Sequence, residues 1–148
     1  MNKIIPKGVL CCGAIFLFGF SASAEEVSFS DFAELKSRAI STGETVGRLQ
    51  ACENANGGRL FGSDLLISKF REHMEKTSLP FEIMEKLDTA MLEAANSEKD
   101  STGWISKYKD FDDSIYSMSE CVDGDVCCLV EAELKVVENR LGDFFSKY

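Results

Sequence analysis

The chain has 148 residues, of which 16 are lysine or arginine, 25 are aspartate or glutamate and one is histidine, giving a net charge of −9. An acidic surface repels phosphate backbones and anionic lipids, so nucleic acid and a membrane surface are poor candidates for partners. The length suits one domain with a single hydrophobic core.

The N-terminal segment has the three-part order of a cleaved secretory signal peptide. Two lysines precede an apolar run over residues 8–20, which the small residues 21–24 follow. The run is shorter than the roughly 20 residues that span a membrane, and signal peptidase requires small residues at its cleavage positions. We predict cleavage after Ala24. The mature single domain, residues 25–148, is then expected in the periplasm or the medium, without a stable membrane anchor.

Cleavage would remove Cys11 and Cys12 with two lysines and no acidic residue, which changes the net charge from −9 to −11. A lipoprotein signal is disfavoured, because it needs a small residue before the modified cysteine and Leu10 is large. Four cysteines remain in the mature chain: Cys52, Cys121, Cys127 and Cys128. An even number in an oxidising compartment predicts disulfides rather than zinc, which would need better spaced ligands.

Three pairings of four cysteines are possible, and one of them is disfavoured. A bridge between the adjacent Cys127 and Cys128 would close a strained small ring. We therefore expect Cys52 to pair with one of these two residues and Cys121 with the other. Either arrangement ties the first helical region to the last.

Apolar residues recur at helical spacing, and no long stretch alternates with period two. This pattern predicts an all-α fold, a compact bundle of four to five helices stapled by two disulfides. The first helix should follow a cap at Ser30 and run towards Cys52, although a capping box at Ser41–Glu44 would split it in two. Four small residues share one of its faces: Ala39, Gly43, Gly47 and Ala51. We expect another helix to approach this face closely, since each glycine costs about 1 kcal/mol of helix stability.

Turn residues separate the next helices. After the 54–58 turn, Ser63 should cap a short helix with Leu66, Phe70 and Met74 facing inward. Pro80 marks the start of a third helix, which carries four apolar residues on one face: Met84, Leu87, Met91 and Ala95. The polar stretch 96–103 is expected to be a loop.

The two most regular apolar stripes lie in the last third of the chain. One runs from Trp104 to Val122 and the other from Cys127 to Phe144. The turn at 123–125 is short enough to predict an antiparallel helical hairpin, with Asp125 capping the last helix. Phe144, with the neighbouring aromatics, is expected to seal one end of the bundle.

No motif predicts catalysis or binding of a cofactor or metal. His73, the one histidine, stands between charged residues and is expected to face solvent. The aspartates near 110–113 and 123–125 do not match the spacing of a calcium loop, and no nucleophile elbow or phosphate loop occurs. With 25 acidic residues a pair of carboxylates suited to glycoside hydrolysis could arise by chance. We therefore predict a protein that is not an enzyme.

Aromatic residues at the start of the predicted fourth helix are candidates for partner binding. Trp104 and Tyr108 follow a polar loop, and such residues often dominate binding hot spots, although aromatics at helical spacing usually belong to a core.

Two functional hypotheses follow. The first is a protein-interaction module such as an inhibitor, an immunity protein or a secretion or envelope accessory, whose partner is another envelope protein, most readily a basic one. The alternative is a carrier of a small apolar ligand, suggested by methionines in the apolar stripes: Met74, Met84, Met91 and Met118.

Overall fold

The computed structural model describes residues 27–109, 121 and 125–148, and in these residues the chain is all-helical. The helices are α1 (Phe29–Ala55), α2 (Ser63–Glu75), α3 (Phe81–Lys99), α4 (Gly103–Lys109) and α5 (Val126–Phe145). The predicted all-α bundle is confirmed. Across the described ranges, no helix combines the length and the apolar character needed to cross a membrane. The predicted signal segment, the stripe beyond residue 109, Met118 and the turn at 123–124 lie outside the described residues.

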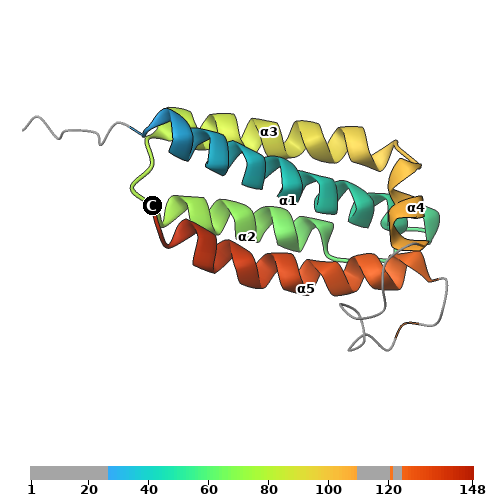
Figure 1. The fold of residues 1–148 in the computed structure, drawn as a ribbon. Helices are drawn as coiled ribbons and strands as arrows, with labels where there is room; N and C mark the ends of the chain where they lie inside the picture. The colour runs from blue at the N-terminus through green and yellow to red at the C-terminus, as the bar shows by residue number, and fades with distance from the viewer. Residues whose placement is uncertain (1–26, 110–120, 122–124) are drawn as a thin grey trace, which may run out of the picture.

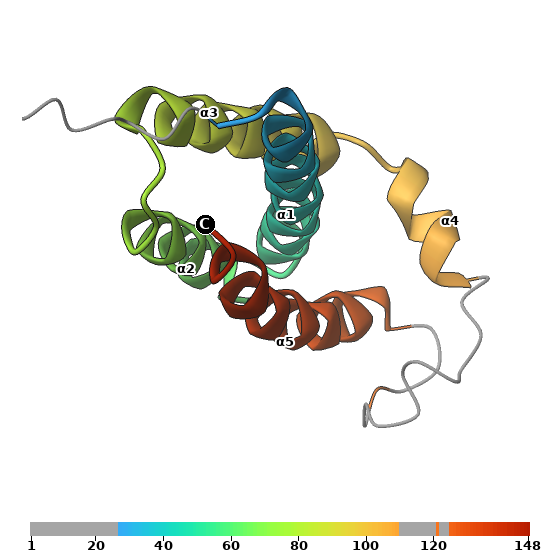
Figure 2. The same cartoon turned by 60° about the vertical axis from the view of Figure 1, so that its left-hand side comes forward.

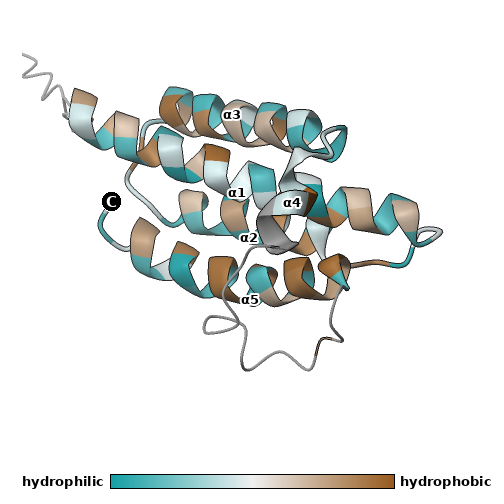
Figure 3. Cartoon of the chain, turned by 45° about the vertical axis from the view of Figure 1, so that its right-hand side comes forward, coloured by the Kyte–Doolittle hydropathy of each residue, from teal (hydrophilic) through white to brown (hydrophobic). Residues whose placement is uncertain are grey.

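The four long helices form two layers, which Figures 1 and 2 show from two sides. In one layer α1 and α3 are parallel, since Gly43 lies beside Met91 and Gly47 beside Ala95. In the other layer α2 and α5 run together in the opposite direction, and the short α4 lies across the end of the bundle where α3 ends (Figure 1). Buried apolar side chains from α1 to α5 form the core cluster, and Figure 3 marks the apolar positions along each helix in brown.

The first helix is continuous, so the alternative with a break at Ser41–Glu44 is wrong. Its hydroxyls bond within the helix instead of capping a new one: Thr42 Oγ1 donates to the carbonyl oxygen of Arg38 at 2.9 Å. The N-cap is Ser28 rather than Ser30, because Ser28 Oγ accepts from the backbone N–H of Asp31 at 3.1 Å. The helix therefore spans the full length of the bundle.

The small-residue face of α1 receives α3 at close range, as predicted. A Cβ on Gly43 would overlap the carbonyl oxygen of Met91 and lie 2.9 Å from the Cβ of Ala94. A Cβ on Gly47 would overlap the carbonyl oxygen of Ala95. Both glycines are needed for the approach of the two backbones, and this packing offsets their poor helix propensity.

Two other helix boundaries differ from the sequence prediction, and one agrees with it. The N-cap of α2 is Gly62, with a left-handed φ of 99°, and Ser63 is the first helical residue. The Ser63 hydroxyl donates to Glu53 Oε2 at 2.7 Å, so it is engaged with α1 instead of capping its own helix. The third helix continues to Lys99 through the polar residues expected to form a loop. Asp125 caps α5 as predicted, accepting from the N–H of Cys128 at 3.0 Å.

Aromatic residues fill the core at the C-terminal end of α5. The rings of Phe70 and Phe145 meet edge to face with centroids 5.5 Å apart, and Phe144 contacts Phe145 in the same manner. All three side chains are buried, which agrees with the predicted sealing of the bundle end.

Two disulfides connect the cysteines in one of the two expected arrangements. Cys52 near the end of α1 bonds to Cys127 in the first turn of α5, and Cys121 bonds to Cys128. The Cys52–Cys127 bond joins positions 75 residues apart and fixes α5 against α1, whereas the Cys121–Cys128 bond closes a separation of only 7 residues.

The first prediction concerns the α1–α3 contact. Gly43→Ala should lower the free energy of unfolding by about 1 to 3 kcal/mol, because the added methyl group overpacks the interface despite the better helix propensity of alanine. Ser37→Ala, on the exposed side of α1, should be neutral or slightly stabilising. Urea denaturation of both variants is the measurement. If both alanine variants were stabilised equally, the α1–α3 contact would have room for the added methyl group.

The second prediction ranks the disulfides. Replacing Cys52 and Cys127 together by alanine should cost about 4 kcal/mol in the chain-entropy model, because this bond closes the longer loop. The same change at Cys121 and Cys128 should cost about 2 kcal/mol. Denaturation of the two double variants under non-reducing conditions tests the order, and the reverse order would refute it.

Candidate functional site

The residues proposed from sequence as partner anchors do not form an exposed pair in the described structure. Trp104 is 5% exposed and belongs to the hydrophobic core, so the core alternative describes its position better than a surface anchor does. Tyr108 lies in α4, but its side chain is outside the described residues, and its role stays a prediction. Burial of Trp104 is a tertiary effect, because α4 folds against α5.

His73 is half-buried between α2 and α5 rather than facing solvent as expected. Its ring lies next to Gly142, where a Cβ would be 3.3 Å from His73 Cε1. The missing side chain of Gly142 leaves room for the imidazole. Within the described ranges, no group of three or more histidine, cysteine or acidic side chains is arranged to hold a metal ion.

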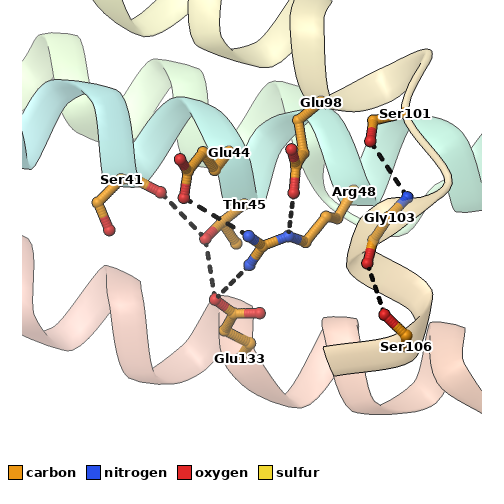
Figure 4. A network of polar contacts seen from close by, with 9 residues as sticks. All are labelled: Ser41, Glu44, Thr45, Arg48, Glu98, Ser101, Gly103, Ser106 and Glu133. Atoms are coloured by element: carbon orange, nitrogen blue, oxygen red, sulfur yellow. Dashed lines mark hydrogen bonds and ion pairs between the residues drawn. The ribbon is translucent and has the colours of Figure 1, made fainter. Parts of the chain in front are cut away.

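A buried arginine connects three helices, and sequence reasoning missed it. The Arg48 side chain on α1 is 10% exposed and its guanidinium contacts three carboxylates (Figure 4). Nε donates to Glu98 Oε1 on α3 at 3.0 Å, and Nη1 donates to Glu133 Oε1 on α5 at 3.3 Å. The third carboxylate is Glu44, one turn earlier on α1, at 3.5 Å from Nη2.

The chemistry of this cluster is structural. Thr45 Oγ1 donates to the same Glu133 oxygen at 3.1 Å, so both layers of the bundle are joined at this point. The guanidinium lies between the carboxylates of Glu98 and Glu133 and donates a hydrogen bond to each. A glycosidase holds its sugar between two carboxyl groups, and the Arg48 side chain occupies that position between this pair.

The sequence contains only a weak signal of the Arg48 cluster. Glu44 and Arg48 stand four residues apart, which is the spacing of an ion pair on a helix surface. Arginines are rarely buried, so the pattern by itself indicates a solvated pair. The glutamates from α3 and α5 reach Arg48 only through the tertiary arrangement.

Glu53 at the end of α1 organises the following loop. Its Oε1 accepts from the backbone N–H groups of Phe61 and Ser63 at 3.0 and 3.1 Å. These bonds place a carboxylate at the start of α2, where the partial positive charge of the helix is favourable for it. The turn between the two layers is thereby held in one conformation.

A surface groove with a volume of about 810 Å³ lies between α1 and α3, towards their N-terminal ends. Its walls consist of Phe32, Lys36, Glu82, Glu85, Lys86, Thr89, Ala90 and Glu93. Phe29 and Phe81, the first residues of α1 and α3, lie at the same end of the bundle and are 88% and 74% exposed. Aromatic side chains are enriched in protein interfaces, and apolar surface of this kind often marks a binding site.

The charged side chains of this groove are not neutralised by the described part of the protein. The groove carries three glutamates and two lysines. None of the five takes part in the ion pairs formed among the described residues, which involve Arg48, Lys69, Arg71, Lys76 and Lys147 as cations. These charges are available to a partner.

The second pocket, of about 420 Å³, lies where α1 begins and α5 ends. The protein's own contacts cross it: Lys147 Nζ is 3.6 Å from Glu34 Oε1, and the Ser78 N–H donates to the carbonyl oxygen of Tyr148 at 3.0 Å. Burial raises the pKa of the Tyr148 phenol, and the carboxylates of Glu34 and Asp31 raise it further. This pocket joins chain segments to one another, whereas no ion pair among the described residues crosses the α1–α3 groove, which is therefore the candidate binding site.

Comparison of the chain with protein-family models, with curated proteins and with solved structures found no match.

The Arg48 cluster leads to the third prediction. Arg48→Met should lower the free energy of unfolding by about 2 to 3 kcal/mol, because it leaves partly buried carboxylates close together without their cation. Arg140→Met removes the same charge from an exposed position on α5 and should change stability by less than about 0.5 kcal/mol. Urea denaturation compares them, and similar losses in both variants would contradict a special role for Arg48.

Proposed function

We propose that the mature domain is a non-catalytic protein-binding module that acts outside the cytoplasm, in the manner of an inhibitor, an immunity protein or an envelope or secretion accessory. The observation that carries this proposal is the α1–α3 groove, in which the half-buried Phe32 lies among charged side chains without ion-pair partners among the described residues. The same end of the bundle also exposes Phe29 and Phe81, the first residues of α1 and α3. Such a surface is suited to a protein partner with apolar anchors and complementary charges.

Rigidity of the surrounding fold supports a binding role. The Cys52–Cys127 bond and the Arg48 cluster both join α1 to α5, and the glycine contact holds α3 against α1. A preorganised surface loses little conformational entropy when a partner binds, so more of the contact energy appears as affinity. The same disulfides are compatible with an oxidising compartment.

The charge of the domain indicates which partners are favoured. With a net charge of −11 after removal of residues 1–24, the domain attracts basic proteins and repels acidic ones. Electrostatic attraction mainly raises the association rate, and it weakens as salt screens the charges. A basic envelope or secreted protein is therefore the expected partner.

The alternative of an apolar-ligand carrier has less support. Met74 and Met91 are buried in the core, and Met84 packs against it. None of the methionines lines either of the two pockets described above. Native mass spectrometry of the protein purified without denaturation would reveal a retained small molecule and would then favour the carrier.

The fourth prediction concerns the partner. The mature domain should be immobilised with both disulfides intact. It should then retain a specific protein from an envelope extract at low salt and release it as salt is raised. The association rate of the purified pair should fall with ionic strength much more steeply than the dissociation rate rises. Surface plasmon resonance measures both rates. Recovery of no envelope or secreted protein at low salt would contradict the proposed function.

A further inference from the structure

We propose that the α1–α3 groove binds an amphipathic helix with basic flanks, contributed by the protein partner. This inference rests on the proposed function and names the kind of element that the binding surface recognises. Four features support it: the length of the groove, its helical walls, its apolar residues and its charges.

The dimensions match a helix of about three turns. The groove residues on α3 extend from Glu82 to Glu93, a length of about 17 Å at 1.5 Å per residue. The groove volume of about 810 Å³ falls in the range of roughly 300–1,000 Å³ that is typical of binding pockets. Two parallel helices form a furrow in which the side-chain ridge of a third helix can lie.

A strand or an extended peptide is a poorer fit. Both walls of the groove are α-helices, and from Glu85 onward the backbone N–H groups of the α3 wall bond within the helix. A strand added to a protein gains affinity from a row of unpaired backbone groups at a sheet edge, and helical walls offer no such row. Recognition here must use side chains, as in complexes where a helix binds a groove.

The apolar residues near one end of the groove are Phe32, which lines it, and two exposed phenylalanines at the helix starts. Phe29 precedes Phe32 by three residues on the same face of α1, and Phe81 is the first residue of α3. Ala90 adds a small apolar surface farther along. An apolar stripe at helical spacing on the partner would cover these side chains, while the alkyl stem of Lys36 extends the apolar surface.

The charges favour basic flanks and disfavour a second copy of this chain. Glu82 and Glu85 near the aromatic end and Glu93 at the far end leave the groove with an excess of one negative charge over Lys36 and Lys86. The mature chain as a whole carries −11. Two copies would therefore repel each other, whereas lysines or arginines on a partner helix would meet unpaired carboxylates.

The test uses the full mature chain and two groups of substitutions with the same change in charge. The first triple variant reverses the charge of the three groove glutamates: Glu82→Lys, Glu85→Lys and Glu93→Lys. The second triple variant reverses the charge of three exposed acidic residues outside the groove: Glu75→Lys, Asp100→Lys and Asp143→Lys. These residues lie at or near the C-terminal ends of α2, α3 and α5, where a positive charge is favourable to the helix. Circular dichroism verifies that both triple variants fold.

The probe is a synthetic peptide of leucine and lysine, with its leucines at helical spacing, and a peptide of the same composition in scrambled order is its control. Fluorescence anisotropy should show binding of the amphipathic peptide and at least about tenfold weaker binding by the groove variant. The triple variant with substitutions outside the groove should bind the peptide less than about threefold more weakly than the unaltered protein. Phe29→Ser with Phe81→Ser, which changes only exposed side chains, should also weaken binding about tenfold.

Three outcomes would overturn the inference: equal losses in the two triple variants, equal binding of the scrambled peptide, or no binding of the amphipathic peptide. Sedimentation of the mature chain as a dimer that the groove substitutions dissociate would also overturn it, because the occupant would then be a second copy. The proposed function is tested separately with the partner retained from the extract. If that partner binds both triple variants equally well, the module function stands and the groove is not its site.

Discussion

The arrangement of the protein depends on the close contact between α1 and α3 at Gly43 and Gly47. This contact is possible only where α1 has no side chains, and it lets the two helices run parallel with their backbones almost touching. Because α1 also contacts α2 and α5, it is the element through which the two layers are connected. The Cys52–Cys127 bond and the Arg48 cluster then attach α5 to this helix. Poor helix propensity at two positions is thus offset by packing that the rest of the fold requires.

Charge is organised differently in the interior and on the surface. Inside, one guanidinium meets three carboxylates and connects α1, α3 and α5, a geometry for which the planar fork of arginine is better suited than lysine. On the outside of α1 and α3, glutamates and lysines of the groove lack ion-pair partners among the described residues. The charges around Arg48 are paired within the fold, whereas those of the groove can meet the charges of a partner.

The position of the groove follows from the residues that separate the two parallel helices. Towards the C-terminal ends, glycine on α1 brings α3 into contact. Towards the N-terminal ends, Phe32 and Lys36 stand on α1 and line the groove opposite Glu82 and Glu85 of α3. The change from small to large residues along one helix therefore creates both the contact and the groove.

The sequence by itself determined the helical class, the set of paired cysteines, the Asp125 cap and the small-residue face of α1, because each depends on local periodicity, on counting or on a neighbouring backbone group. Only the tertiary structure decided that α1 continues through Ser41–Glu44, that α3 extends to Lys99, that Trp104 is buried and that Arg48 meets Glu98 and Glu133. The α1–α3 groove belongs to this second group, since its residues lie about 50 positions apart in the chain. Burial and ion pairing between distant segments depend on how the helices pack. The spacing of residues within one segment does not predict that packing.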